Sequence, residues 1–544
     1  MLPIVARFHA AKSWGTVALL VVAGGWMQAA DMVITGARIY TGDSERPIAS
    51  ELWVKDGRIA SSHPGATAKH IDARGATIIP GFIDSHAHME SLGDELETFD
   101  LRNVRTVAEV AEIVRQAAVG RKPGEWIRGR SWDQTNWGGR FPTAEDLPAE
   151  HPVYLARVDG HAAWVNRKAL EIAGITAKTP DPPGGRILRT ESGEPTGILI
   201  DHAEELVLRK IPPATPEETR RRIARAAREC ARLGITTVHD AGVSPQALAA
   251  YRELIARGEL PVRVYAMIGG PGPLWQEYLK RGPEIGERLT VRSIKLLADG
   301  ALGSRGAALL APYTDDPGNS GLLMLTSEQI ERVAREAAGR GFQVNTHAIG
   351  DRANRVVLAA YAAVLGGPND RRFRIEHAQV VAPEDFELFA KYSIVPSMQA
   401  THATSDMRWA QARLGAERVK GAYAWRRFLS LGLTVPNGSD FPVEEPNPLL
   451  GFYAAITRQD RAGHPEGGWF PDQRMTREEA LKSWTWSGAW AAFEENQKGS
   501  LTPGKLADFV MLSADIMRIP PREIPATRVI MTVVGGEVVY PVAQ

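Results

Sequence analysis

The sequence contains one cysteine, Cys230, among its 544 residues. An intramolecular disulfide is therefore impossible, and zinc sites built from several cysteines are excluded. Cys230 itself lies in a helical-looking run and is expected to be a small buried hydrophobic residue. Any metal ion in this protein must be held mainly by histidine, aspartate, glutamate or lysine.

An excess of charge of either sign is also missing. Lys and Arg together number 64, as do Asp and Glu, so the formal net charge is zero. This balance gives no indication of nucleic acid as a partner, and a small-molecule substrate is expected instead. With 44% hydrophobic and 24% charged residues the chain has a globular composition, and its length predicts two or more structural units. A homo-oligomer is compatible with these features.

Long apolar runs are scarce, and no stretch predicts a stable membrane span. The run at 14–26 is mostly apolar but short for a span, and Arg7 and Lys12 precede it. This pattern is typical of an export signal, so residues 1–30 are predicted to be a signal peptide and the protein to be periplasmic or extracellular in a bacterium. The alternatives are an uncleaved anchor, or a mis-assigned start that leaves the protein in the cytoplasm.

Both ends of the chain carry short segments of alternating polarity, which predict strands. An Asp-Gly turn at 56–57 and a Gly-Gly turn at 535–536 are typical of hairpins. We expect one small β-sandwich domain built from residues 31–75 and 491–544, although two unconnected edge hairpins would give the same pattern. The expected strand segments are 31–40, 51–55, 56–59, 507–512, 528–534 and 537–540.

The middle of the chain, residues 76–490, alternates between short apolar runs and helical stretches such as 328–339 and 352–365. This alternation predicts a parallel sheet, and eight repeats predict a closed (β/α)8 TIM-type barrel, so the fold class is α/β. The connection at about 89–234 is far too long for one crossover and must hold an insertion, with an extra strand at 152–156. The expected barrel strands are 77–84, 235–239, 262–268, 293–297, 342–347, 373–377, 394–398 and 433–437.

In such a barrel, functional side chains gather at the carboxyl ends of the strands. His86 and His88 follow the first expected strand, and on an extended segment their side chains point to one face, about 6–7 Å apart at the backbone. Two imidazoles placed in this way can bind one ion at about 2.0–2.1 Å each. A lone His-x-His is weak evidence for a metal site, but other candidate side chains also fall at strand ends: His239, Asp240, His347, His377 and Asp440.

Several motifs strengthen this interpretation. The segment Pro-Gly-Phe-Ile-Asp-Ser-His-Ala-His at 80–88 resembles the opening metal motif of the amidohydrolase superfamily. Four further blocks resemble the branch that includes N-substituted formamide deformylases, and the terminal segment 499–509 also fits. The resemblance covers nearly the whole chain after residue 30, in the right order. The four blocks lie at 294–305, 345–352, 374–379 and 437–442.

This resemblance implies a centre with two divalent metal ions. Zinc is the expected metal, with Co, Ni, Mn or Fe as alternatives, because imidazole and carboxylate ligands suit all of them. The implied ligands are His86, His88 and Asp440 for the first ion, His347 and His377 for the second, and a carboxylated Lys295 as the bridge between them.

Lys295 can act as a bridge only after modification, because an ammonium group has no acceptor. A carbamate made with CO2 is anionic and offers two oxygens. Lys295 follows Ile294 in an apolar run, where burial would lower its pKa and expose a reactive amine. The alternatives are a single-metal site without carboxylation, a surface lysine, or an ion pair with Asp299.

Asp440 has two expected roles, as a ligand and as the general base. A catalytic zinc ion lowers the pKa of bound water from about 15.7 to about 7. The implied enzyme cleaves a carbon–nitrogen bond of an amide, N-formyl or N-acyl compound other than a peptide, by metal-activated hydroxide. Asp440 would relay the proton to the leaving amine. Taken alone, Asp440 could equally cap the turn at Gly438 and Ser439.

Four residues outside the metal set are candidates for substrate binding. Trp132 and His161 lie in the long insertion, Arg305 follows the lysine strand, and His402 follows the seventh strand. An arginine can hold a carboxylate or carbonyl oxygen, and a histidine can donate to an oxyanion. An arginine in such a place is more often a structural ion-pair partner. His239 is expected to be a satisfied barrel histidine.

Other activities on the same fold stay open at this point. A lactonase or esterase and a cyclic-amide hydrolase would use the same side chains, because water attack follows the same chemistry. Deaminases of this superfamily tend to carry a Glu three residues after the fifth-strand histidine, and here that position is Gly350. A non-catalytic metal-binding protein is disfavoured because all six candidate ligands are present.

Overall fold

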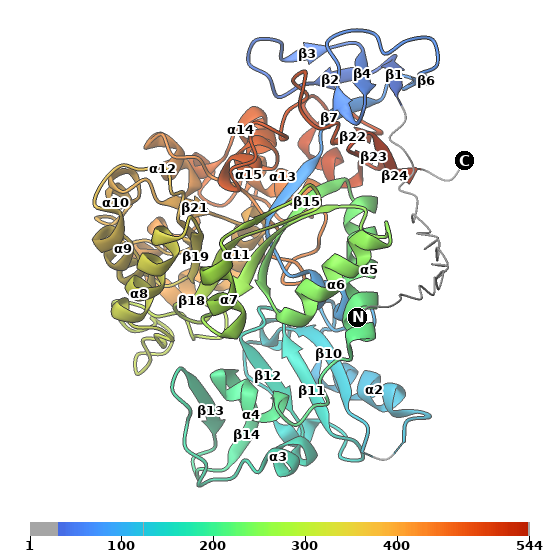
Figure 1. Ribbon diagram of the computed structural model, residues 1–544. Helices are drawn as coiled ribbons and strands as arrows, with labels where there is room; N and C mark the ends of the chain where they lie inside the picture. The colour runs from blue at the N-terminus through green and yellow to red at the C-terminus, as the bar shows by residue number, and fades with distance from the viewer. Residues whose placement is uncertain (1–30, 123, 542–544) are drawn as a thin grey trace, which may run out of the picture.

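The computed structural model describes residues 31–122 and 124–541 (Figure 1). The predicted signal peptide at 1–30 lies outside these residues. Within the described ranges, no helix is both long enough and apolar enough to cross a membrane.

Seven parallel strands form a nearly closed barrel at the centre of the molecule (Figure 1). Every neighbouring pair along the barrel is parallel, which confirms the predicted barrel architecture. In spatial order the strands are β8 (Phe82–Ala87), β15 (Ile235–Val243), β16 (Arg263–Gly269), β18 (Leu289–Leu297), β19 (Gln343–Ala348), β20 (Arg374–His377) and β21 (Val395–Ser397).

The eighth expected strand, 433–437, does not form a regular strand, so that prediction is wrong in detail. Single contacts close the barrel instead. The Met398 amide donates to the Pro436 carbonyl, and the Ser85 amide donates to the Asn437 carbonyl. Pro436 has no N–H to contribute to a ladder, and the segment 433–437 contacts β21 and β8 only through isolated bonds.

Helices surround the barrel, and their sequences contain the signals that start them. In α5 (Pro216–Arg232), Thr215 and Glu218 form a reciprocal capping box, and Pro216 occupies the first turn. The predicted helices at 328–339 and 352–365 are confirmed. The other helices on this part of the chain are α6 (Pro245–Ala256), α7 (Pro273–Arg281), α8 (Ser327–Gly339), α9 (Asp351–Leu365), α10 (Phe386–Lys391), α11 (Ala400–Arg418), α12 (Trp425–Ser430), α13 (Pro448–Thr457), α14 (Arg477–Ser483) and α15 (Trp486–Ala491).

The long insertion contains a six-stranded sheet of its own, spanning Phe99 to Asp201, which we call the inserted sheet (Figure 1, cyan to green). Its core packs Trp132, Leu155 and Trp164 together. The predicted strand at 152–156 is present as β11. The strands are, in spatial order, β13 (Gly185–Arg189), β14 (Pro195–Asp201), β12 (Ala162–Val165), β11 (Val153–Arg157), β10 (Ile127–Trp132) and β9 (Phe99–Asp100); the helices between β8 and α5 are α1 (Met89–Glu95), α2 (Val107–Ala118), α3 (Arg167–Ala173) and α4 (Glu205–Leu208).

The two ends of the described chain meet in one region, above the barrel in Figure 1. There β7 (Thr77–Pro80) pairs antiparallel with β22 (Phe509–Leu512), so N-terminal and C-terminal strands share a sheet. That sheet has the order β24 (Glu537–Pro541), β23 (Val529–Val534), β22, β7, β2 (Arg38–Tyr40), β3 (Ile48–Ala49). A second sheet has the order β5 (Arg58–Ile59), β4 (Leu52–Lys55), β1 (Met32–Thr35), β6 (Lys69–Asp72).

Candidate active site

The six predicted metal ligands converge at the carboxyl ends of the barrel strands. The ring of His377 lies 4.9 Å from that of His86 and 4.6 Å from that of His347. Nζ of Lys295 lies 3.1 Å from Nε2 of His86. The remaining two ligands join the same cluster, because Oδ1 of Asp440 lies 3.5 Å from Nε2 of His86 and 3.1 Å from Nε2 of His88.

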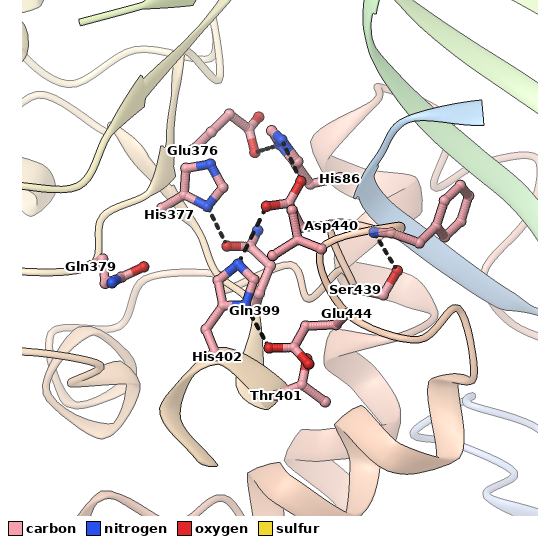
Figure 2. A network of polar contacts seen from close by, with 12 residues as sticks. His86, Glu376, His377, Gln379, Gln399, Thr401, His402, Ser439, Asp440 and Glu444 are labelled. Atoms are coloured by element: carbon pink, nitrogen blue, oxygen red, sulfur yellow. Dashed lines mark hydrogen bonds and ion pairs between the residues drawn. The ribbon is translucent and has the colours of Figure 1, made fainter. Parts of the chain in front are cut away.

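The histidine rings are oriented by acceptors on their outer sides (Figure 2). Nδ1 of His86 donates to Oε2 of Glu376 at 2.7 Å, and Nδ1 of His377 donates to Oε1 of Gln399 at 2.7 Å. Nδ1 of His88 donates to the carbonyl of Ala241 at 2.8 Å. Since each of these oxygens can only accept, the proton resides on Nδ1 and each Nε2 keeps its lone pair for the centre of the cluster.

In this arrangement, lone pairs of ring nitrogens face a carboxylate oxygen. A cation bound between these atoms would remove their mutual repulsion. Nε2 of His88 and Oδ1 of Asp440 face each other at 3.1 Å, although both carry lone pairs. Oδ1 of Asp440 is buried without a hydrogen-bond partner among the described residues. Within each of two sets the ligand atoms lie within 4.8 Å of one another: His86, His88 and Asp440, and His377, His402 and Asp440. His347 belongs to neither set, and its Nε2 lies 3.5 Å from Oδ1 of Asp299. The donor set fits a divalent metal.

Burial shapes the charges of these groups. It lowers the pKa of His86 and His377 well below the ordinary value and also lowers the pKa of Lys295. Burial alone would raise the pKa of Asp440, but the hydrogen bond from His402 and the contacts with the neighbouring histidines together outweigh burial and hold the pKa of that carboxyl well below its usual range. Neutral imidazoles beside an ionised carboxylate are the state in which such side chains bind a metal.

Several non-glycine residues at this site have backbone angles in the left-handed region. The φ angles are +73° at His377, +42° at Ala378 and +58° at Asp440. In a regular strand Glu376 and His377 would point to opposite faces. The turn at His377 breaks the alternation, so Glu376 supports His86 while His377 faces the cluster. Conformations of this kind persist where the surroundings enforce them, and they concentrate at functional sites.

The Asp440 turn is held tightly against the end of β8. Asp84 accepts hydrogen bonds from the amide and the hydroxyl of Ser439, and the Asp440 amide donates to the His86 carbonyl at 2.7 Å. A Cβ atom at Gly438 would lie 2.6 Å from the His86 nitrogen, so only glycine allows this close approach. The turn begins at Asp440 rather than at Gly438 and Ser439, and these contacts hold Asp440 at the cluster.

A cavity of about 420 Å³ opens above the cluster, between the barrel and the inserted sheet. Barrel loops form one side of its lining, with residues such as Leu297, Leu302 and Trp409. The inserted sheet forms the other, with Arg130, Asp133, Arg157, Asp159 and His161 among the lining residues. A substrate in this cavity would contact both units.

Two of the four candidate substrate residues line this cavity, and both are histidines paired with carboxylates. His161 donates from Nδ1 to Asp201 at 2.7 Å, and His402 lies between Asp440 and Glu444, at 3.3 and 3.1 Å. Burial alone would lower both histidine pKa values. The hydrogen bonds and the negative charges of the carboxylates together outweigh burial and raise the pKa of His161 to about 9 and that of His402 to about 10.

The other two candidates do not line the cavity. Trp132 is completely buried in the inserted sheet, where its indole N–H donates to the Leu155 carbonyl. Its ring therefore packs in the core of that sheet. Arg305 forms an ion pair with Asp315 and borders a separate surface hollow. Neither Trp132 nor Arg305 lines the cavity in this structure, and their role in substrate binding stays a prediction. His239, in the barrel interior, accepts a hydrogen bond from Arg374.

Sequence reasoning missed the residues that support the cluster. Glu376, Gln399 and Glu444 are separated from their partners by long stretches of chain, and each is an ordinary polar residue in its own segment. The one available signal was position: Glu376 directly precedes a candidate ligand in an expected barrel strand, where a buried carboxylate needs a partner.

Comparison with known proteins identifies the family. The profile described as Amidohydrolase family matches residues 69–540. The chain therefore belongs to the amidohydrolase family of metal-dependent hydrolases, which confirms the family indicated by the motif at 80–88 and the blocks that follow it.

Several known proteins are similar in sequence or structure to nearly the whole chain. Protein LONG AFTER FAR-RED 3 of Arabidopsis thaliana is 36% identical, over 97% of this chain and 94% of that protein. N-substituted formamide deformylase of Arthrobacter pascens is 27% identical, over 94% of this chain and 99% of that protein. The solved structure of an uncharacterised metal-dependent hydrolase from Pyrococcus horikoshii has a TM-score of 0.73 at 29% identity, covering 90% of this chain and 99% of that one.

Proposed function

We propose that this protein hydrolyses the carbon–nitrogen bond of a small amide, of the N-formyl or N-acyl type, other than a peptide. The observation that carries the proposal is the inward-facing set of lone pairs on His86, His88 and Asp440, at the base of a cavity that His88 and Asp440 line. The name of the deformylase relative supports this bond type, because that protein is 27% identical over almost its whole length.

The chain's own residues are suited to hold two divalent ions. Zinc is the expected metal, and Co, Ni, Mn or Fe would suit the same ligands. When bound, such ions polarise a carbonyl and make water a better nucleophile at neutral pH. We infer that His86, His88 and Asp440 hold one ion, His347 and His377 hold the other, and Lys295 bridges them after carboxylation. Burial of the Lys295 amine, which lowers its pKa, supports the reaction of its neutral form with CO2.

Asp440 is the proposed general base. Its Oδ1 is buried at the centre of the cluster without a hydrogen-bond partner among the described residues, and its Oδ2 lies 3.3 Å from His402. A carboxylate in this position can take a proton from the attacking water with Oδ1 and pass it to the leaving nitrogen. His402 and His161 line the cavity on either side and are the proposed contacts for polar atoms of the substrate.

The structure offers a physical reason to disfavour deamination. The position three residues after His347 is Gly350, whose amide donates to Asp299 at 2.8 Å. A Cβ atom there would lie 1.9 Å from the carbonyl oxygen of Ala308. The glutamate that deaminases tend to carry at this position has no space. Lactones, esters and cyclic amides fit the same chemistry and are distinguished by experiment.

We also infer that the two terminal sheets form a single small β-sandwich domain. One apolar cluster joins residues from both ends of the chain, including Ile34 and Val54 with Phe509 and Val533. Shared burial of this kind supports a domain assembled from residues 31–75 and 491–544, with the barrel and its insertion between them. Export through residues 1–30 stays a prediction, and N-terminal sequencing of protein secreted by an expression host would test it.

The test of the proposed function is a substrate screen against metal-loaded protein. Matched sets of N-formyl amines, N-acyl amino acids, small cyclic amides and lactones would be compared by kcat/KM, with metal content measured on the same sample. We expect turnover of N-formyl or N-acyl amides, about two metal equivalents, and loss of both together on chelation. Preference for a lactone would overturn the bond assignment, and a protein that binds no metal at any pH would overturn the proposal entirely.

A further inference from the structure

One histidine–aspartate pair of the inserted sheet lies beside the cluster of candidate metal ligands. His161 lies in the turn between β11 and β12, and Asp201 is the last residue of β14. Nδ1 of His161 and Oδ1 of Asp201 are 2.7 Å apart. The ring of His161 lies 5.1 Å from the ring of His347, so this pair reaches the barrel from outside it.

The barrel has room for this pair because of two glycines in the loop after β18. A Cβ atom at Gly300 would lie 2.5 Å from Oδ2 of Asp201, and one at Gly306 would lie 2.4 Å from it. The Asp201 side chain is fully buried between them. The carboxylate is thus enclosed by a loop of the barrel while it belongs to the inserted sheet.

The backbone of Asp201 is strained, with φ +49° and ψ −127°. A residue with a Cβ rarely adopts this conformation, and it persists only where the surrounding structure enforces it. Two features do so here: the Asp201 amide donates to the His161 carbonyl, and the carboxylate accepts from the His161 ring. The strained backbone therefore places the Asp201 carboxylate against Nδ1 of His161.

His161 is fixed from its backbone side as well. Its amide donates to Oδ1 of Asp159, and Asp159 is in turn paired with the buried Arg157. With amide and Nδ1 both engaged, the ring has little freedom. Nε2 is the ring atom left over: it has no hydrogen-bond partner among the described residues, and the ring lines the cavity.

We propose that Asp201 is a positioning residue for His161, and that Nε2 of His161 donates a hydrogen bond to the acyl oxygen of the bound substrate. This inference rests on the proposed amide hydrolysis. In the proposed complex the ring donates from Nδ1 to the Asp201 carboxylate and from Nε2 to the acyl oxygen, with a proton on each nitrogen. The inserted sheet then completes the active site, because the bond to the acyl oxygen strengthens as that oxygen gains negative charge.

The test compares His161→Gln, Asp201→Asn and the double variant, with His151→Gln as the matched control. His151 is a histidine of the same insertion whose ring bonds only the Glu125 carbonyl among the described residues. The probe is N-benzylformamide, with bound metal measured in every sample. We expect His161→Gln to lower kcat by about 10²–10³-fold, the usual loss for one oxyanion donor, with KM changed by less than about threefold and metal content unchanged.

The double variant separates positioning from a merely structural role. If Asp201 acts through His161, Asp201→Asn alone lowers kcat by about tenfold or more, and adding it to His161→Gln lowers kcat no further. Additive losses would overturn the positioning role, and a His161→Gln variant with unaltered kcat would overturn the inference even if Asp201→Asn fails to fold. Absence of turnover in the unaltered, metal-loaded protein is a different outcome, since it overturns the proposed function on which the inference rests.

Discussion

Nδ1 of His86 and Oε2 of Glu376 lie 2.7 Å apart, and both side chains are completely buried. The two residues come from β8 and β20, which are not neighbours in the barrel sheet. The contact fixes the proton of His86 on Nδ1 and turns Nε2 toward Lys295 and Asp440. A carboxylate behind a ligating histidine also makes the imidazole more basic, so Glu376 belongs to the proposed metal site without touching the metal.

Glu376→Gln should weaken metal binding by about 10–100-fold, the usual effect of removing such a support. The glutamine side chain can still accept a hydrogen bond from Nδ1 of His86, so the ring keeps its tautomer. Only the negative charge of the carboxylate is lost. Competition with a chelator of known zinc affinity measures the change. Glu387→Gln, at an exposed position of α10, is the control. Equal metal affinity in both variants would show that the carboxylate does not tune the site.

His86→Ala should abolish hydrolysis with a modest loss of stability. The side chain lies at the end of β8, above the apolar core of the barrel, so its removal takes away a ligand and leaves the packing of the strands intact. Turnover, bound metal and the thermal midpoint would be measured on one preparation. Turnover that survives the substitution would show that the metal assignment is wrong, whereas an unfolded protein would show only that the residue is needed for structure.

Lys295→Ala should lose activity and regain part of it in the presence of a short carboxylic acid. Nζ of Lys295 is buried 3.1 Å from Nε2 of His86, so truncation leaves space where a carbamate would lie. Formate, acetate and propionate would be titrated against kcat. His86→Ala, which lacks a different ligand, should not respond to the same acids. If no acid restores activity and the variant still binds two equivalents of metal, the bridge is not a carbamate.

The sequence predicted the barrel and the ligand cluster because both depend on short local patterns. Six of the apolar runs became barrel strands, and the first, 77–84, is divided between β7 of a terminal sheet and β8 of the barrel. The run at 433–437 contacts its neighbours only through isolated bonds; its Pro436 lacks an N–H, although β21 forms with Pro396 inside it. His86, His88, His347, His377 and Asp440 come together because they stand at strand ends.

The partners of these residues could not be predicted in the same way. Glu376 lies beside His377 in sequence, and regular alternation would send the two side chains to opposite faces; the positive φ at His377 reverses this. Trp132 was a candidate for substrate binding from its place in the long insertion, but its indole packs in the core of the inserted sheet. Such outcomes depend on contacts between distant segments, which local patterns do not encode.

The inserted sheet contains a carboxyl group whose titration should change stability. Oε2 of Glu204 accepts from the Tyr154 hydroxyl at 2.6 Å. Burial raises the pKa of Glu204 from 4.5 to about 8, helped by the charge of Asp201 and opposed by the Tyr154 bond. The folded state therefore holds this proton more tightly than the unfolded state does. The resulting stabilisation is complete below pH 4.5 and is lost as the pH rises through about 8.

Glu204→Gln should remove this pH dependence. Glutamine stays neutral at every pH and can still accept from Tyr154, so the variant avoids burying a charge at alkaline pH. At pH 9 it should be the more stable protein by up to about 5 kcal/mol, an upper value set by the size of the pKa change. The measurement is the thermal midpoint between pH 5 and pH 9, with Glu205→Gln at the exposed neighbouring position as control. The midpoints of Glu204→Gln and the unaltered protein should diverge as the pH rises. Curves that run parallel across this range would mean that Glu204 is already ionised in the folded protein, and that the insertion supplies a compensating charge.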